Sequence, residues 1–270
     1  MSDQRTKQDG AVQESFKISD SNNKLSEIRI VLIGGRDVFG RNESGKSSVG
    51  NIILGKDAFV VGRRTARSVQ ASANVHGRHV TVVDTPGWWW HYLAENTPKF
   101  DLLEIMRSPT LCSPGPHAFL LVIPVDCSFD REYGLGLEKH LEFFSETVWN
   151  HIIVLFSSIA PHDDTSLKNH LKKCPDFKKL LSRCQNRYHV LDIHERHDSF
   201  QVIALLEKIE KMMAINNGQS FKISKKFTLE EKRDDSIREQ TTQRIPAVKR
   251  KKSELDAHIR GRKFFIAYSR

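Results

Sequence analysis

The sequence predicts an α/β fold in which a three-layer, doubly wound and mainly parallel sheet is covered by helices on both faces. Two observations lead to this fold class. The nearly continuous β-branched run Glu27–Ile33 and the apolar run 118–123 are typical of strands that are buried on both faces. Segments with helical spacing of apolar residues alternate with these runs, and such alternation favours a parallel sheet with right-handed crossovers.

The expected elements follow this alternation along the chain. His76-Gly77 separates two strand-like segments and predicts a hairpin turn. Leu137, Leu141, Phe144 and Val148 recur at helical spacing, and Asp126 is expected to cap the turn before them. In chain order we expect strand 27–33, helix 45–53, hairpin strands 68–75 and 78–84, strand 118–123, helix 133–148, strand 151–156, strand 187–191 and helix 199–215.

Composition and charge divide the chain into three parts. A polar leader is expected over 1–26, a globular domain over 27–216 and a basic tail, partly helical or disordered, over 217–270. The net charge of +9 lies almost wholly in the tail, where residues 219–270 hold 15 basic and 7 acidic side chains. With 39% hydrophobic residues, the chain is too apolar to be disordered throughout. The nearly neutral body disfavours a nucleic-acid-binding domain.

Targeting and redox signals favour the cytoplasm. The longest apolar run, Ala118–Val125, is shorter than the roughly 20 residues of a membrane-spanning helix. The first ten residues carry no apolar signal-peptide core. The four cysteines show no C-x-x-C pairing, which is typical of reduced thiols.

A phosphate-binding loop is predicted between the first strand and the first helix. The segment 40–47 reads Gly-Arg-Asn-Glu-Ser-Gly-Lys-Ser and fits the pattern G-x-x-x-x-G-K-[ST]. Its backbone N–H groups would converge on phosphate oxygens, with Lys46 at the β- and γ-phosphates and the Ser47 hydroxyl on Mg²⁺. We therefore assign nucleotide binding to Gly40, Arg41, Asn42, Glu43, Ser44, Gly45, Lys46, Ser47 and Ser48. Six residues, 34–39, separate this loop from the strand, a longer connection than such sheets usually have.

A second motif completes the predicted Mg²⁺-nucleotide site. The strand at 82–84 ends in Asp84-Thr85-Pro86-Gly87, an Asp-x-x-Gly box. Asp84 would complete the Mg²⁺ shell with Ser47, and Gly87 would offer its N–H to a γ-phosphate. Asp-Thr-Pro-Gly is also an ordinary turn sequence, so the argument depends on its place at the end of a strand.

Together these motifs resemble the GIMAP family, septin- and paraseptin-like immunity-associated GTPases with a P-loop GTPase fold. The resemblance rests on the phosphate loop with 47–55, the Asp84–Trp89 box, 115–125 and Arg187–Val190, and it covers roughly 27–216. The long connection 34–40 resembles the fish branch of the family. The resemblance implies GTP or GDP and Mg²⁺ as ligands, a GTP-dependent surface that forms homo- or hetero-oligomers, and a role as a switch or assembly scaffold in immune signalling.

Base selection departs from the family pattern. The Thr/Asn-Lys-x-Asp box corresponds to 156–160, where Ala160 replaces the acid that pairs with guanine. Ser157 and Ser158 are the polar residues of this stretch, and Asp192 stands where family members tend to place Asn. We assign these three residues to the base side of the site. Guanine selectivity stays open at this point.

Hydrolysis and the first switch also depart from the pattern. Trp88 follows Gly87 where a water-positioning Gln is common, so slow or absent turnover is expected and no catalytic residue is assigned. Gln70 stands where a Mg²⁺-binding Thr is usual, which leaves Thr65 and Ser68 as substitutes. The three adjacent tryptophans, 88–90, cannot all face one core, so at least one is expected at a surface or interface.

Two alternatives to a GTPase switch stay open. The first is a pseudo-GTPase that binds nucleotide weakly or without base selection and works through partner contacts. The second makes the tail the functional part: the basic cluster 249–252 and the apolar patch 263–268 could contact an anionic membrane surface or, less favoured, nucleic acid.

Overall fold

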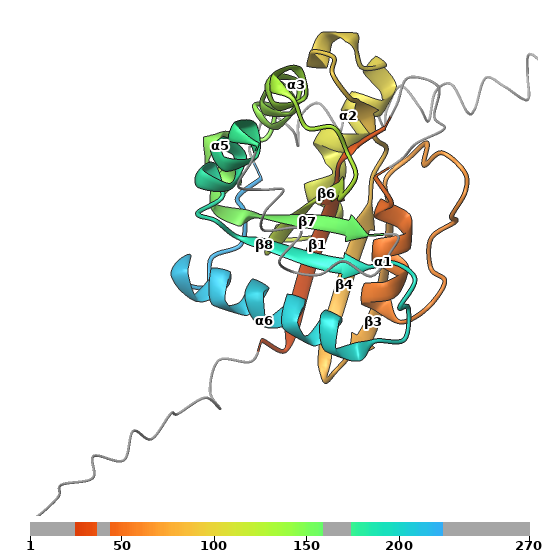
Figure 1. Ribbon diagram of the computed structural model, residues 1–270. Coiled ribbons are helices and arrows are strands. Elements are labelled where there is room, and N and C mark those ends of the chain that lie inside the picture. The colour runs from red at the N-terminus through yellow and green to blue at the C-terminus, as the bar shows by residue number, and fades with distance from the viewer. Residues whose placement is uncertain (1–24, 37–43, 159–173, 224–270) are drawn as a thin grey trace, which may run out of the picture.

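The computed structural model describes residues 25–36, 44–158 and 174–223. A six-stranded sheet with the order β3-β4-β1-β6-β7-β8 forms the centre of the molecule (Figure 1). Its strands are β1 (Glu27–Ile33), β3 (Val69–Val75), β4 (Arg78–Asp84), β6 (Ala118–Pro124), β7 (Ile152–Ser158) and β8 (Tyr188–Asp192). Only β3 runs antiparallel to its neighbour, so the predicted mainly parallel sheet is confirmed.

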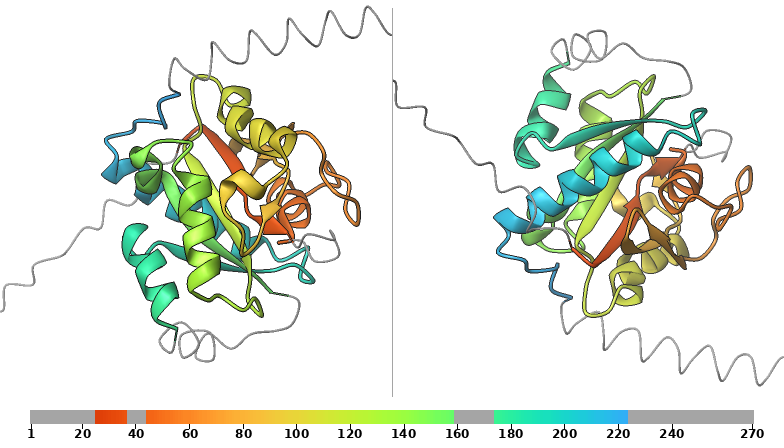
Figure 2. Two further views of the ribbon diagram at one scale, coloured as in Figure 1. Left: turned by 90° about the horizontal axis from the view of Figure 1, so that it is seen from above. Right: turned by 90° about the horizontal axis from the view of Figure 1, so that it is seen from below.

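The helices cover both faces of the sheet, as predicted. One face packs against α2 (Lys99–Arg107), α3 (Arg131–Leu141) and α5 (Pro175–Arg183), the other against α1 (Lys46–Leu54) and α6 (Ser199–Ile215). The two further views show α6 crossing one face of the sheet and α3 and α5 covering the other (Figure 2). Short 3-10 turns lie at Ala94–Asn96, Ser108–Leu111 and Glu146–His151. This three-layer arrangement is the doubly wound α/β fold that the sequence predicts.

The alternation of side chains along each strand explains why the sheet has a buried hydrophobic core on both faces. In β1, Ile28, Ile30 and Leu32 face α1 and α6, whereas Val31 and Ile33 face the other helical layer. All five side chains are fully buried. Because successive strand residues point to opposite faces, a continuous apolar run is needed to fill two cores at once.

The long connection after β1 forms a strand that the sequence did not predict. Gly35–Arg36 make β2, which pairs in parallel with β5 (Trp88–Trp89), directly after Gly87. The Trp90 ring covers Gly35 so closely that a Cβ there would lie 1.8 Å from Trp90 Cδ1. β2 thus links the chain that leads from β1 to the phosphate loop with the segment that follows the Asp-x-x-Gly box.

Three element boundaries differ from the expectations. The expected helix 133–148 is instead α3, which ends at Leu141, and a 3-10 turn at Glu146–His151. Ser145, with φ 129°, lies between the two and prevents one continuous helix. Asp130, and not Asp126, caps α3 by accepting the Tyr133 N–H. Packed structure also continues past residue 216, since Phe221 is buried against Phe119 with ring centroids 5.1 Å apart.

Within the described residues, no helix has the length and apolar character needed to cross a membrane. Residues 1–24 of the expected leader (1–26) and residues 224–270 of the expected basic tail (217–270) lie outside the described ranges.

Candidate nucleotide-binding site

The end of the phosphate loop lies at the carboxyl-end edge of the sheet, near the ends of β1 and β7, which are separated by β6. Gly45 adopts the left-handed conformation with φ 80° and leads directly into α1, whose first internal hydrogen bond joins Val49 N–H to the Gly45 carbonyl. The N–H groups of the first turn of a helix have no carbonyl partner within the helix, and they favour an anion there. Ser157 Oγ donates to the Ser44 carbonyl at 3.0 Å and fixes this corner to β7.

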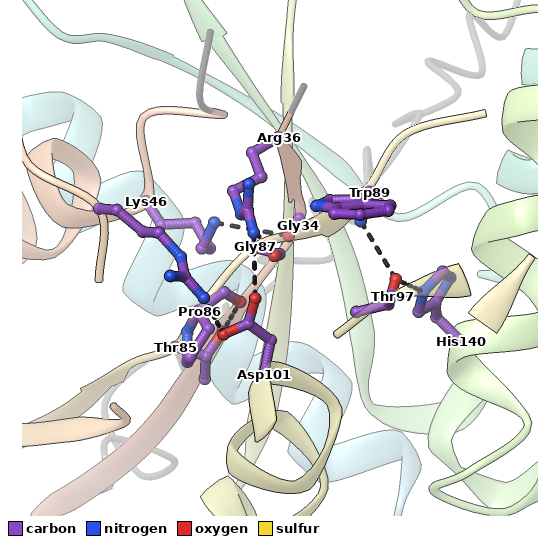
Figure 3. A network of polar contacts seen from close by, with 11 residues as sticks. Gly34, Arg36, Lys46, Thr85, Pro86, Gly87, Trp89, Thr97, Asp101 and His140 are labelled. Atoms are coloured by element: carbon purple, nitrogen blue, oxygen red, sulfur yellow. Dashed lines mark hydrogen bonds and ion pairs between the residues drawn. The ribbon is translucent and has the colours of Figure 1, made fainter. Parts of the chain in front are cut away.

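Lys46 is buried at this corner. Its ammonium donates to the Gly34 carbonyl at 3.4 Å (Figure 3). It also donates to Ser44 Oγ at 3.2 Å. The side chain therefore folds back over the end of β1 and places its charge beside the start of α1. The two predicted motifs come together here, because Ser47, the residue after Lys46, donates its hydroxyl to Asp84 Oδ2 at 2.7 Å.

Ser47, Thr65 and Asp84 form a compact oxygen cluster. Ser47 Oγ donates to Asp84 Oδ2 at 2.7 Å, and Thr65 Oγ1 donates to the same oxygen at 2.9 Å. The two hydroxyl oxygens lie 3.4 Å apart. Of the two substitutes predicted for the first switch, Thr65 is the one whose hydroxyl contacts Asp84. Ser68 instead donates its hydroxyl to the Glu104 carbonyl, and Gln70 is exposed on β3.

The electrostatics of the cluster favour a bound cation. Asp84 is almost fully buried, and among the described residues its Oδ1 has no hydrogen-bond partner. Burial raises the pKa of Asp84 above its ordinary value, against the opposing effects of the Lys46 charge and the Ser47 and Thr65 hydroxyls. A hydroxyl and a carboxylate with an unpaired buried oxygen are ligands that suit Mg²⁺. The residues present therefore fit the expected metal.

The remaining predicted site residues are placed unevenly. Ser48 lies half-buried in the first turn of α1, and Gly87 is buried beside the side chain of Arg36. Asp192 ends β8 and is paired in register with Ser158 at the end of β7. Gly40, Arg41, Asn42, Glu43 and Ala160 lie outside the described residues.

The buried side chain of His140 holds the tryptophan segment 88–90 in place. Trp88 is fully buried and stacks on His140 with ring centroids 5.1 Å apart. Thr97 Oγ1 lies 2.7 Å from His140 Nε2 and accepts the Trp89 N–H at 3.3 Å (Figure 3). Burial lowers the pKa of His140 to about 4, so this ring is neutral near pH 7. Trp89 and Trp90 are partly exposed, as expected for at least one of the three.

Sequence reasoning missed a group of charged residues around Gly87. Arg36 Nε donates to the Gly87 carbonyl at 3.1 Å, and its Nη2 donates to Asp101 Oδ2 at 3.0 Å. Arg64, next to Thr65, donates to the other oxygen of Asp101. The only signal in the sequence is the unusual length of the 34–39 connection, which draws attention to Arg36 without indicating its partner.

Comparison with known proteins now gives the family. Residues 29–241 match the AIG1 family. This chain belongs to the AIG1 family. It is 29% identical over 222 residues to immune-associated nucleotide-binding protein 13 of Arabidopsis thaliana, covering 78% of this chain and 63% of the relative. It is 27% identical over 208 residues to human GTPase IMAP family member 8, covering 74% of this chain and 30% of the relative. The expected GIMAP resemblance is confirmed, although the chain spans less than two thirds of both proteins.

Solved structures confirm the fold of this AIG1-family chain. Toc33 of Arabidopsis thaliana in complex with GDP and Mg²⁺ superimposes with a TM-score of 0.56 at 16% identity, over 74% of this chain and 89% of Toc33. A dimerization-deficient Toc33 mutant gives the same TM-score over 73% of this chain and 88% of that one. At this identity the likeness establishes the P-loop GTPase fold alone.

Proposed function

We propose that this AIG1-family chain binds Mg²⁺ with GTP or GDP and acts as a nucleotide-dependent switch or assembly scaffold in immune signalling. The single observation that carries the proposal is the cluster of Ser47, Thr65 and Asp84 beside Lys46, with Asp84 Oδ1 buried and lacking a partner among the described residues. A divalent cation at Oδ1 would offset the cost of burying the carboxylate. That the structural neighbour Toc33 has been solved with GDP and Mg²⁺ supports this choice of ligands.

The residues of the site would bind different parts of the Mg²⁺-nucleotide. Lys46, the backbone of Ser44 and Gly45 and the first turn of α1, including Ser48, would hold the β-phosphate and neutralise its charge. Ser47 and Asp84 would hold Mg²⁺, which would neutralise part of the phosphate charge. Thr65 and the Gly87 N–H would face the γ-phosphate. The assignments of Gly40, Arg41, Asn42 and Glu43 stay predictions.

Slow or absent hydrolysis follows from the environment of Trp88. An indole cannot orient the attacking water, and the ring is fully buried and stacked on His140. Position 88 therefore offers no polar side chain that could hydrogen-bond to an attacking water. This observation favours the pseudo-GTPase alternative as the second candidate.

Asp192 is our candidate for reading the base. Its backbone N–H donates to Gln201 Oε1 at 2.9 Å, and its Oδ1 accepts the His194 N–H at 2.8 Å, so the end of β8 is held in place. A carboxylate can accept hydrogen bonds from both N1–H and the 2-amino group of guanine. Asp192 could therefore replace the acid that the sequence lacks at 160. Asp192→Asn, which converts one acceptor into a donor, should then weaken GTP binding and favour xanthosine triphosphate.

Oligomer formation would use exposed apolar side chains on loops and at the start of α2. Val60, Tyr92, Leu93 and Phe100 are all more than two fifths exposed. Exposed apolar groups near a nucleotide-dependent loop suit a self-association surface. Light scattering should show a larger mass with the non-hydrolysable analogue GMPPNP than with GDP, and equal masses would contradict this part of the proposal. Contact of 249–268 with an anionic membrane stays a prediction, because those residues lie outside the described ranges.

Calorimetric titration of the full chain with GTP, GDP and ATP, each with Mg²⁺, tests the proposed function. We expect GTP and GDP to bind and ATP to bind at least about tenfold more weakly, the scale of one charge-assisted hydrogen bond. Equal GTP and ATP affinities would support the non-selective pseudo-GTPase. Failure of all three nucleotides to bind would overturn the proposal.

A further inference from the structure

The side chain of Arg36 lies across the Gly87 peptide. Its Nε donates to the Gly87 carbonyl, and a Cβ on Gly87 would lie only 3.0 Å from Arg36 Cγ. The Arg36 carbonyl in turn accepts the Trp90 N–H at 3.0 Å. Arg36 is 4% exposed, so these contacts are shielded from water. The backbone of Gly87 is therefore held from one side by a buried guanidinium.

Asp101 on α2 joins this guanidinium to a second one. One oxygen of its fully buried carboxylate accepts Arg36 Nη2 at 3.0 Å, and the other oxygen accepts Arg64 (Figure 3). Arg64 is half-exposed and directly precedes Thr65. A buried carboxylate that loses a charged partner is strongly destabilised, so both arginines are held firmly. One side chain of α2 thus links the Gly87 segment to the Thr65 loop.

Glu104, one helical turn further along α2, fixes the far end of the same loop. Its Oε2 accepts the Ser68 N–H at 2.9 Å, and its backbone carbonyl accepts Ser68 Oγ at 2.7 Å. The loop 64–68 is therefore attached to α2 at both ends. Thr65 lies between the two attachments and points to Asp84.

From these contacts we infer that Arg36 and Asp101 are positioning residues for the γ-phosphate. The inference rests on the proposed function. Arg36 hydrogen-bonds to Gly87, and Asp101 forms ion pairs with both Arg36 and Arg64. Because Arg64 directly precedes Thr65, the Asp101 carboxylate fixes the positions of both groups that would face the γ-phosphate, Thr65 and the Gly87 N–H. GDP has no γ-phosphate. Breaking this linkage must therefore weaken triphosphate binding and leave diphosphate binding unchanged.

The test compares the affinities of full-length variants for Mg²⁺–GMPPNP and Mg²⁺–GDP by calorimetry. Arg36→Met and Arg64→Gln should each lower GMPPNP affinity by about tenfold, within the usual range of coupling between sites, while GDP affinity stays within about twofold. Arg36→Lys keeps the charge but not the planar fork, so we expect it to restore only part of the loss. Arg64 is half-exposed, so Arg64→Gln keeps the test valid if Arg36→Met does not fold.

The matched control is Glu210→Gln, which breaks the Arg78–Glu210 ion pair between β4 and α6. This pair does not contact Gly87 or Thr65, so neither nucleotide affinity should change. Equal losses for GMPPNP and GDP in the arginine variants, or no loss for either, would overturn the inference and leave the proposed function intact. A wild-type chain that binds neither nucleotide would overturn the proposed function and the inference with it.

Discussion

Replacing Asn51 with alanine should destabilise the start of the Thr65 loop more than any single contact there suggests. Asn51 lies on α1 and is 4% exposed. Its Oδ1 accepts the N–H groups of Ala58 and Phe59 at 2.9 and 2.8 Å, and its Nδ2 donates to the Phe59 carbonyl at 2.9 Å. One side chain thus satisfies three backbone groups at the point where the chain leaves α1.

The magnitude follows from what the substitution leaves unpaired. Each buried backbone group that loses its partner costs about 1–3 kcal/mol. Both Phe59 groups are buried, whereas Ala58 is only partly buried and its N–H can be reached by water. We therefore expect Asn51→Ala to lower the free energy of unfolding by about 3 kcal/mol, which corresponds to about 6–12 °C in Tm for a domain of this size.

Urea unfolding followed by circular dichroism measures this loss. Asn74→Ala is the matched control, because Asn74 is exposed on β3 and the chemical change is the same. The control should change the free energy of unfolding by less than about 0.5 kcal/mol. If Asn51→Ala is no more destabilising than Asn74→Ala, the three hydrogen bonds do not hold the loop and the reasoning fails.

Two further predictions concern ionisation. Asp84→Asn should raise the Tm of the nucleotide-free chain, because burial raises the pKa of Asp84 and so makes its charged form costly in the folded state. The same substitution should abolish Mg²⁺-dependent GTP binding. An unchanged or lower Tm would contradict the prediction. Burial lowers the pKa of His117, His140 and His189 from 6.5 to about 4, so the unfolded chain binds more protons between these values. Stability should therefore fall as pH is lowered from about 6.5 to 4, by at most about 4 kcal/mol per pH unit in urea titrations, and a flat profile would contradict it.

The sequence predicted the parts of the fold that depend on local pattern. The buried run of β1, the hairpin around His76-Gly77 and the helix after Gly45 are each set by residues within a short window, and all three are present. The start of α3 was misplaced because Asp126 and Asp130 are equally good capping residues. Only packing decides between them, and the structure selects Asp130.

The sequence predicted the site residues that belong to a motif with fixed spacing. It did not predict residues that contact each other only through the tertiary fold. Lys46 and Asp84 come from two motifs with known roles, and the structure joins these motifs through the hydrogen bond from Ser47 to Asp84. Thr65 could not be distinguished from Ser68, because the loop between α1 and β3 has no regular period that fixes its register. The Arg36–Asp101 pair joins positions 65 residues apart through a two-residue strand, for which a single sequence gives no signal.

The central claim, that Lys46, Ser47 and Asp84 form a Mg²⁺–GTP site, is tested most directly by titrating Lys46→Ala with Mg²⁺–GTP. Lys56→Ala is the matched control, because Lys56 is exposed and its ammonium donates to the Ser72 carbonyl on β3, away from Lys46, Ser47 and Asp84. We predict that wild type and Lys56→Ala bind with equal affinity and that Lys46→Ala binds at least about tenfold more weakly. Equal GTP affinity in Lys46→Ala and wild type would contradict the claim.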